Sequence, residues 1–128
     1  MTPAFGLSTI GQIALMVRDI GSAVEFYRDK LGLPFLLQTP KMAFFDCDGV
    51  RLVLGPEEAD RRTYSSLIYF KVREIEAASA ELQSRGVIFQ RDPHLVARLP
   101  DYDLWMAFFR DPDGNALALM CEKPRPAL

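Results

Sequence analysis

The sequence is poor in the residues that most often carry enzyme chemistry. Among its 128 residues there is one histidine, His94, and there are two cysteines, Cys47 and Cys121. The cysteines stand alone, without the close spacing of a zinc site, and two small buried thiols are typical of a protein kept in a reducing compartment. We therefore predict a cytoplasmic protein that holds no metal and no other cofactor.

Long apolar runs and runs of one charge are also absent. No segment approaches the 18 apolar residues of a membrane span, and residues 1–8 lack the basic and apolar regions of a secretory signal. The net charge is −2 with no basic run, which argues against nucleic acid as a partner. The whole sequence is 49% hydrophobic and 25% charged, as expected for one globular domain over residues 1–128.

The chain contains an internal repeat. Val-Arg-Asp-Ile at 17–20 recurs as Val-Arg-Glu-Ile at 72–75, an offset of 55 positions, and the acidic turn Asp46-Cys47-Asp48-Gly49 recurs as Asp111-Pro112-Asp113-Gly114, an offset of 65. A repeat fixes the architecture before any other feature is considered. Two copies predict two modules, at about 8–56 and 64–123, related by a pseudo-twofold axis with a cleft between them.

Each half reads as a strand, a helix and three further strands. The helix of the first half begins at Asp19, which can cap it, and shows an apolar face with spacings of four, three and four up to Gly32. The chain is therefore predicted to be an α+β protein of two βαβββ modules, with mixed sheets around the cleft and helices outside. The expected strands are 10–17, 35–38, 42–46, 50–54, 67–72, 87–90, 104–110 and 116–121, and the second helix face is Ile75, Ala78 and Leu82.

The second half is longer than the first. The offset rises from 54 at Gly86 to 65 at Gly114, so 11 extra residues lie near 92–103, a stretch with Pro93, Pro100 and three aspartates. We expect a loop there, either a lid over the cleft or a simple surface excursion. His94 falls in this segment.

The repeat, the helix Ala23 to Leu33 (AVEFYRDKLGL) and the turn Asp111 to Asn115 (DPDGN) together resemble the vicinal oxygen chelate superfamily. This family includes glyoxalase I, bleomycin-resistance proteins, fosfomycin-modifying transferases and extradiol dioxygenases, and the resemblance covers about residues 8–122. It implies a divalent metal held by the first and last strands of each module. The corresponding positions here are Gln12, Val53, Leu67 and Ala118, of which only Gln12 can coordinate, so we predict that no metal site is retained.

Strand parity predicts the lining of the cleft, because alternate side chains share one face of a strand. Ile13, Leu15 and Val17, and likewise Ile68, Phe70 and Val72, are assigned to the core. Either Trp105 or Met106 should also face the cleft, and Arg51 and Lys71 either pair with a ligand or point into water. The predicted ligand-binding residues are Gln12, Met16, Arg51, Val53, Leu67, Tyr69, Lys71, Trp105, Ala118 and Met120; no catalytic residue is assigned.

Three functions are compatible with this pattern. The first is a metal-free protein that sequesters a neutral or anionic, partly aromatic metabolite or antibiotic, as the resemblance to bleomycin-resistance proteins implies. The second is a metal-independent lyase or isomerase acting on a carbonyl compound, with Tyr69, Lys71 or His94 as proton carrier. The third is an interaction or regulatory domain with a vestigial cleft. Edge strands and the apolar Phe5, Leu7 and Ile10 favour a homodimer.

Overall fold

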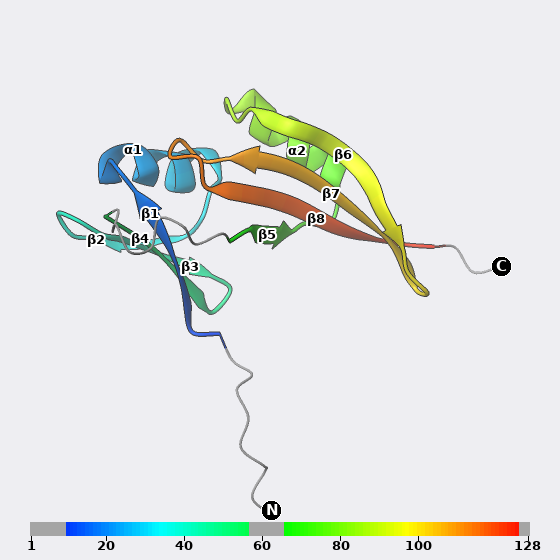
Figure 1. Cartoon of the computed structure of the whole chain (residues 1–128), viewed down its shortest axis with the longest axis horizontal. Coiled ribbons are helices and arrows are strands. Elements are labelled where there is room, and N and C mark those ends of the chain that lie inside the picture. Colours follow the sequence, from blue (N-terminus) through cyan, green and yellow to red (C-terminus); the bar gives the residue numbers. More distant parts are fainter. Residues whose placement is uncertain (1–9, 57–65, 126–128) are drawn as a thin grey trace, which may run out of the picture.

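The computed structural model describes residues 10–56 and 66–125, which form two four-stranded sheets and helices (Figure 1). One sheet has the order β1-β4-β3-β2 and the other the order β5-β8-β7-β6. This is the predicted α+β arrangement of two βαβββ modules. The strands are β1 Gln12–Val17, β2 Phe35–Gln38, β3 Ala43–Cys47, β4 Val50–Pro56, β5 Ile68–Lys71, β6 Phe89–Arg98, β7 Tyr102–Arg110 and β8 Ala116–Pro124.

The two modules use the same pairing. In each sheet the first strand runs parallel to the last, β1 with β4 and β5 with β8, and the other neighbours are antiparallel. A parallel pair needs a crossover connection, which the helical segment supplies in each half. The order of elements in the repeat therefore places the first and last strands side by side.

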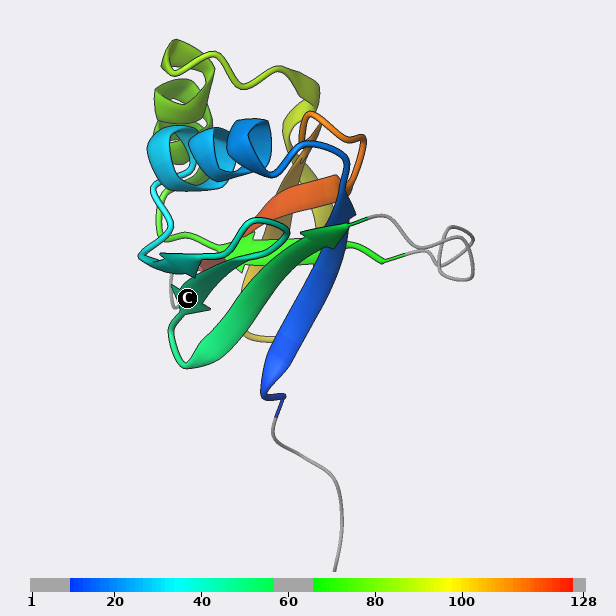
Figure 2. The same ribbon diagram turned by 90° about the vertical axis from the view of Figure 1, so that its left-hand side faces the viewer.

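Helices cover one side of both sheets (Figure 2). The first consists of α1 (Ile20–Val24), continued by the π-helix η1 (Glu25–Lys30); the second is α2 (Ile75–Ser84). The Asp19 carboxylate accepts from the Ser22 backbone N–H at 3.0 Å and caps α1, as predicted. The two helices meet near their carboxyl ends, where Arg85 Nη1 donates to the Lys30 carbonyl at 3.1 Å.

The core lies between the sheets and these helices. Leu15, Val17, Leu52, Leu54, Leu117 and Leu119 alternate along their strands and are all buried. Their neighbours Gln12 and Ala14, on the other face of β1, are exposed, whereas Val53 and Ala118, on the same face of the inner strands, are buried. The predicted parity of β1 is therefore seen directly. Among the described residues, no helix is long and apolar enough to cross a bilayer.

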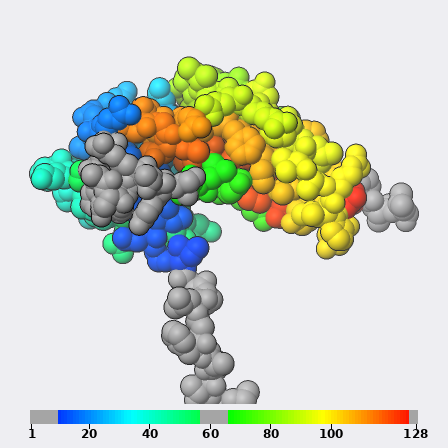
Figure 3. Space-filling view, in the orientation of Figure 1, coloured from blue at the N-terminus to red at the C-terminus, as the bar shows by residue number. Residues whose placement is uncertain are grey.

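The extra residues of the second module do not form a loop. They lengthen β6 and β7 into a hairpin that extends away from α1, seen as the yellow arm in Figure 3. The predicted loop at 92–103 is thus wrong. The prediction took Pro93 as a sign of a loop. However, β6 is an edge strand, and its ladder to β7 shifts register between Arg91 and His94, where a residue without an N–H is tolerated.

The two acidic turns of the repeat differ in length. In module one the last pair is Cys47 with Val50, closed by Asp48 and Gly49, whose φ angles of 53° and 94° suit a tight hairpin turn. In module two the last ladder pair is Arg110 with Ala116. Beyond it the Asp111 N–H donates to the Asn115 carbonyl at 3.0 Å. Counted outward from the sheets, Asn115 corresponds to Val50, as the offset of 65 suggested, whereas Asp111 corresponds to Cys47, one position away from its sequence match Asp46.

Candidate functional site

The two modules meet at two junctions related by the repeat. In the first, which we call the closed junction, Tyr27, Asp111, Asp113 and Asn115 join η1 and β1 to the β7–β8 turn. The Tyr27 hydroxyl donates to Asp111 Oδ2 at 2.9 Å. Asn115 Nδ2 donates to the Met16 carbonyl at 3.0 Å, and the Arg18 backbone N–H donates to Asp113 Oδ1 at 2.8 Å. Module one is thus hydrogen-bonded to module two at this junction.

Asp111 is the centre of the closed junction. Its carboxylate is 5% exposed and also accepts from the backbone N–H groups of Asp113 and Asn115, at 2.9 and 2.8 Å, and from Asn115 Nδ2 at 2.7 Å. A buried carboxylate is stable when its oxygens are satisfied in this way. Burial raises the pKa of Tyr27 well above its usual value of 10, and the neighbouring Asp111 charge raises this pKa further. The phenol therefore stays protonated as a donor.

The second junction lacks the counterparts of Tyr27, Asp111 and Asn115, although Asp113 keeps an acidic counterpart in Asp48. Since α1 begins at Ile20 and α2 at Ile75, Tyr27 corresponds to Leu82. Asp111 and Asn115 correspond to Cys47 and Val50. We call Leu82, Cys47 and Val50 the open junction. All three line a cavity of about 710 Å³ between the modules.

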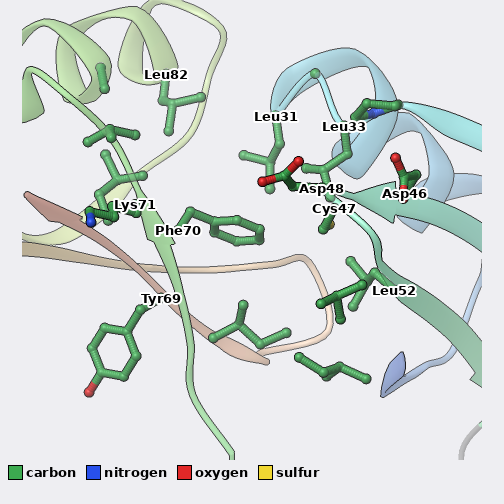
Figure 4. Close-up of a pocket in the computed structure, with 18 of the residues that line it drawn as sticks. Leu31, Leu33, Asp46, Cys47, Asp48, Leu52, Tyr69, Phe70, Lys71 and Leu82 are labelled. Atoms are coloured by element: carbon green, nitrogen blue, oxygen red, sulfur yellow. The ribbon is translucent and has the colours of Figure 1, made fainter. Parts of the chain in front are cut away.

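The walls of the cavity are mainly apolar. They come from α2, β5, the β3–β4 turn and the segment from Leu31 to Pro34 that follows η1. Figure 4 shows Phe70 pointing from β5 toward the side of Leu31 and Cys47, with Leu82 above it on α2. Phe109 and Leu119 complete the wall formed by the second sheet.

Charged side chains on the cavity are balanced. Among the described lining residues three are acidic, Asp46, Asp48 and Glu81, and three are basic, Arg51, Lys71 and Arg85. Lys71 Nζ lies 3.1 Å from Glu122 Oε1, and Arg85 Nε lies 3.1 Å from Glu81 Oε2. The Arg51 side chain is exposed, and no ion pair joins it to another residue of 10–56 or 66–125. Burial, and then the nearby Asp46 charge, raises the pKa of the Cys47 thiol.

Three of the predicted ligand-binding residues border this cavity: Arg51, Tyr69 and Lys71. They are exposed at its edge, and Figure 4 shows Tyr69 directed to the other side of β5 from Phe70. The predicted Leu67 is half-buried just before β5 and does not line the cavity. Five others lie on the sheet faces turned away from the helices, also outside the cavity lining: Gln12, Met16, Val53, Ala118 and Met120.

Trp105 lies on the helix side of the second sheet. It is paired with the buried Cys121 in the β7–β8 ladder, and Lys123 Nζ stands 4.2 Å from its ring centroid. Lys123 in turn contacts Glu76 of α2 at 2.6 Å. Met106, paired with Met120, is therefore the one of these two neighbours on the outer face. Trp105 is not among the cavity residues.

Several cavity residues were assigned to the core by strand parity. Ile13, Ile68 and Phe70 do face the helix side, but they are only half-buried and line the cavity. Parity assigns a face, and it does not show whether that face is filled. Comparing the halves position by position offers the missing signal, because Tyr27 in one helix stands where Leu82 stands in the other.

The metal positions implied by the resemblance do not supply a metal-binding donor set. Val53 is 3% exposed and Ala118 is fully buried, and neither has a donor atom in its side chain. Leu67 contributes none either, which leaves the amide of Gln12. Within residues 10–56 and 66–125, no group of three or more His, Cys, Asp or Glu side chains is placed to hold an ion. The residues present therefore do not fit the family's metal.

Comparison with known proteins places this geometry in a family. Over 123 residues the chain is 29% identical to the uncharacterized protein YraH of Bacillus subtilis, covering 84% of this chain and 94% of that one. It is 26% identical over 127 residues to catechol-2,3-dioxygenase of the same organism, covering 91% of this chain but spanning only 42% of the dioxygenase.

A solved structure agrees with this placement. The antibiotic-binding protein TnmS3 of a Streptomyces species superposes with a TM-score of 0.72 at 25% identity, over 95% of this chain and all of that one. The family model described as Glyoxalase/Bleomycin resistance protein/Dioxygenase superfamily matches residues 9–119. With two βαβββ modules and this match over most of its length, the chain belongs to the glyoxalase/bleomycin resistance protein/dioxygenase superfamily.

Proposed function

We propose that this protein binds and sequesters a small neutral or anionic, partly aromatic molecule in the cavity between its modules, without a metal. The observation that carries the proposal is the cavity itself. Its volume of about 710 Å³ lies within the range of small-molecule sites, and apolar walls with a few polar groups are typical of them. Its balanced charges argue against a strongly cationic ligand. The similarity to an antibiotic-binding protein supports the same class of function.

The acid–base alternative has less support. Tyr69 and Lys71 lie on β5 and His94 lies on β6, the opposite edges of a four-stranded sheet. Three strand spacings, roughly 14 Å, separate His94 from Tyr69 and Lys71, so a proton transfer at the cavity would fall to Tyr69 or Lys71 without help from His94. His94 Nδ1 is instead 2.8 Å from the Asp92 carbonyl, and its ring lies tilted by 35° beside that of Phe108, with centroids 5.8 Å apart. The third hypothesis, an interaction or regulatory domain with a vestigial cleft, does not account for a cavity of this volume with mainly apolar walls.

A thermal-shift screen against metabolites and antibiotics, run with and without EDTA, tests the proposal. At ligand concentrations of about a hundred times Kd, binding should stabilise the fold by about 2.7 kcal/mol, and EDTA should change neither the shift nor the ligand-free melting temperature. Elemental analysis should find no stoichiometric Zn, Ni, Fe or Mn. About one tightly held ion per chain, or turnover of a carbonyl compound, would contradict the proposal.

Arg51 is the proposed anchor for a negatively charged group. Arg51→Ala should weaken an anionic ligand from the screen about ten- to a hundredfold, since a charge-assisted contact contributes about 1.5–3 kcal/mol. Lys71→Ala should cost less because Lys71 already pairs with Glu122. Arg98→Ala, an exposed arginine of β6 outside the cavity lining, is the matched control. Unchanged affinity in both cavity variants would remove Arg51 and Lys71 from the site.

We also propose that the protein is a homodimer. Of the three N-terminal residues that suggested it, Phe5 and Leu7 lie outside the described residues, and Ile10 is 63% exposed. The edge strand β2 exposes Leu36 and Leu37 by 53% and 51%. Exposed apolar edges of this kind are usually covered by a partner chain. Light scattering that gave a monomer at micromolar concentration would refute the dimer and leave the cavity proposal intact.

A further inference from the structure

The two junctions differ in three corresponding residues, and the difference specifies a ligand chemistry. Tyr27, Asp111 and Asn115 join the modules in the closed junction, whereas Leu82, Cys47 and Val50 stand apart around the cavity. We propose that an uncharged aromatic ring of the ligand packs among Leu82, Cys47 and Val50, in the place that corresponds to the Tyr27 phenol, and that these residues select it. This inference rests on the proposed function and names its substrate class.

The closed junction shows how a ring fills this place. The Tyr27 side chain is fully buried, with its ring centroid 5.3 Å from that of Phe26 and 6.0 Å from that of Phe45. Phe45 lies opposite Leu52 in its sheet as Phe109 lies opposite Leu117 in the other, and Leu52 and Leu117 correspond by the offset of 65. Phe109 is therefore the counterpart of Phe45, and it lines the cavity. Together with Phe70 it offers aromatic surface to a ring that the chain does not provide.

The chemistry of the open junction excludes charge from that ring. Cys47 replaces the carboxylate of Asp111, and burial raises its pKa, which keeps the thiol neutral. Val50 replaces the amide of Asn115 and has no side-chain donor or acceptor. A charged group placed among these three side chains would lose hydration without gaining a partner from them, which is unfavourable. A negative charge on the ligand should therefore lie outside this group, near Arg51 and Lys71 at the edge of the cavity.

Two dyes with one ring skeleton test this placement by fluorescence titration at pH 7. N-phenyl-1-naphthylamine is uncharged, and 8-anilino-1-naphthalenesulfonate is the same skeleton with a sulfonate. Both should bind the wild-type protein with dissociation constants below about 100 μM, because both present uncharged aromatic surface to the open junction. Arg51→Ala should weaken only the sulfonated dye.

Leu82→Phe adds a ring from the chain itself and should weaken both dyes by at least about tenfold while keeping or raising the melting temperature, since it fills empty volume. Val50→Asn is a second, independent variant; its amide should weaken both dyes by roughly three- to tenfold. Tyr27→Phe is the matched control in the closed junction. It should leave both affinities within about twofold even though it destabilises the fold.

Each outcome decides the question. If the wild-type protein binds neither dye below about 100 μM, the inference is overturned, and the screen and Arg51→Ala still judge the proposed function separately. If it binds them and neither Leu82→Phe nor Val50→Asn changes the affinity, the ring lies elsewhere and only the inference fails. Loss of dye binding in Tyr27→Phe equal to that in Leu82→Phe would also overturn it, because the two junctions would then not differ.

Discussion

The closed and open junctions are formed by corresponding segments of the repeat, yet one is joined by hydrogen bonds and the other borders a cavity. At the closed junction Asp111 accepts hydrogen bonds from Tyr27, Asn115 and the turn backbone, and these bonds link the two modules. At the open junction Leu82 and Cys47 have no such link, and a cavity of about 710 Å³ remains. We propose that one copy of this duplicated contact stabilises the fold and that the other forms the ligand site.

The lengths of the two turns account for part of this difference between the junctions. The longer β7–β8 turn brings Asp113 to the Arg18 N–H and Asn115 to the Met16 carbonyl. The two-residue turn at Asp48 and Gly49 is too short to make the equivalent contacts with module two. The turn with one added residue thus bonds to the other module, whereas the shorter turn lines the cavity.

The largest expected effect comes from breaking the closed junction at its centre. Asp111→Ala removes the acceptor for the Tyr27 hydroxyl, the Asn115 amide and two backbone N–H groups, and leaves these donors unpaired in a buried place. We expect a loss of about 3 kcal/mol in the free energy of unfolding, measured by urea denaturation. A loss below about 1 kcal/mol would mean that the closed junction does not hold the modules.

Tyr27→Phe should have the next largest effect, about 1.5 kcal/mol near pH 7, because one hydrogen bond to a buried carboxylate is lost. The variant also carries a pH signature. The folded-state pKa of Tyr27 is raised, so above about pH 10 the unfolded chain releases a proton that the folded chain retains. Its contribution is complete below pH 10 and declines as the pH rises, by up to about 1.4 kcal/mol per pH unit.

Urea denaturation between pH 9 and pH 11.5 measures this slope. The wild-type protein should lose stability more steeply than Tyr27→Phe, and the difference isolates Tyr27 from the other tyrosines. Parallel curves for the two proteins would contradict the assignment of Tyr27 as a buried, protonated donor.

Closing the open junction should have a smaller effect of opposite sign. The double variant Leu82→Tyr with Cys47→Asp copies Tyr27 and Asp111 into the second junction. If the correspondence is right, the new pair stabilises the protein by about 1 kcal/mol and dye binding is lost. Leu82→Tyr with Cys47→Ala is the control without an acceptor, and it should gain less. Destabilisation by the double variant beyond that of its control would show that the junctions are not equivalent.

The smallest effect is expected at the surface between the helices. Arg85 pairs with Glu81 one turn away and donates to the Lys30 carbonyl; Arg85 and Glu81 are exposed and Lys30 is half-buried. Arg85→Ala should change the free energy of unfolding by less than about 1 kcal/mol. A larger loss in thermal denaturation would assign to this contact part of the stability that we attribute to Asp111.

The repeat made most of the fold predictable, because the hydrophobic alternation of β1 recurs in β5 at an offset of 55 and that of β4 recurs in β8 at an offset of 65. The helix start at Asp19 followed from its capping chemistry. The hairpin of β6 and β7 could not be predicted in this way, because Pro93 indicates a loop unless the strand is known to lie at the edge of the sheet. Edge position is a property of the assembled sheet.

The site was less predictable, for a related reason. Parity correctly separated Leu15 from Gln12, and it brought Arg51, Tyr69 and Lys71 to the border of the cavity. It could not reveal the cavity, because Phe70 and Ile68 have the alternation of a filled core. Only the assembled structure, in which α2 and the β3–β4 turn border one cavity, shows that Leu82 leaves space where Tyr27 fills it.

The most direct test of the difference between the junctions is a crystal structure of the protein with N-phenyl-1-naphthylamine bound. We predict that one of its aromatic groups lies between α2 and the β3–β4 turn, in contact with Leu82, Cys47 and Val50, while Tyr27 and Asp111 stay hydrogen-bonded. A dye molecule on the outer sheet faces beside Val53 and Ala118, or one that displaces Tyr27 from Asp111, would contradict the account.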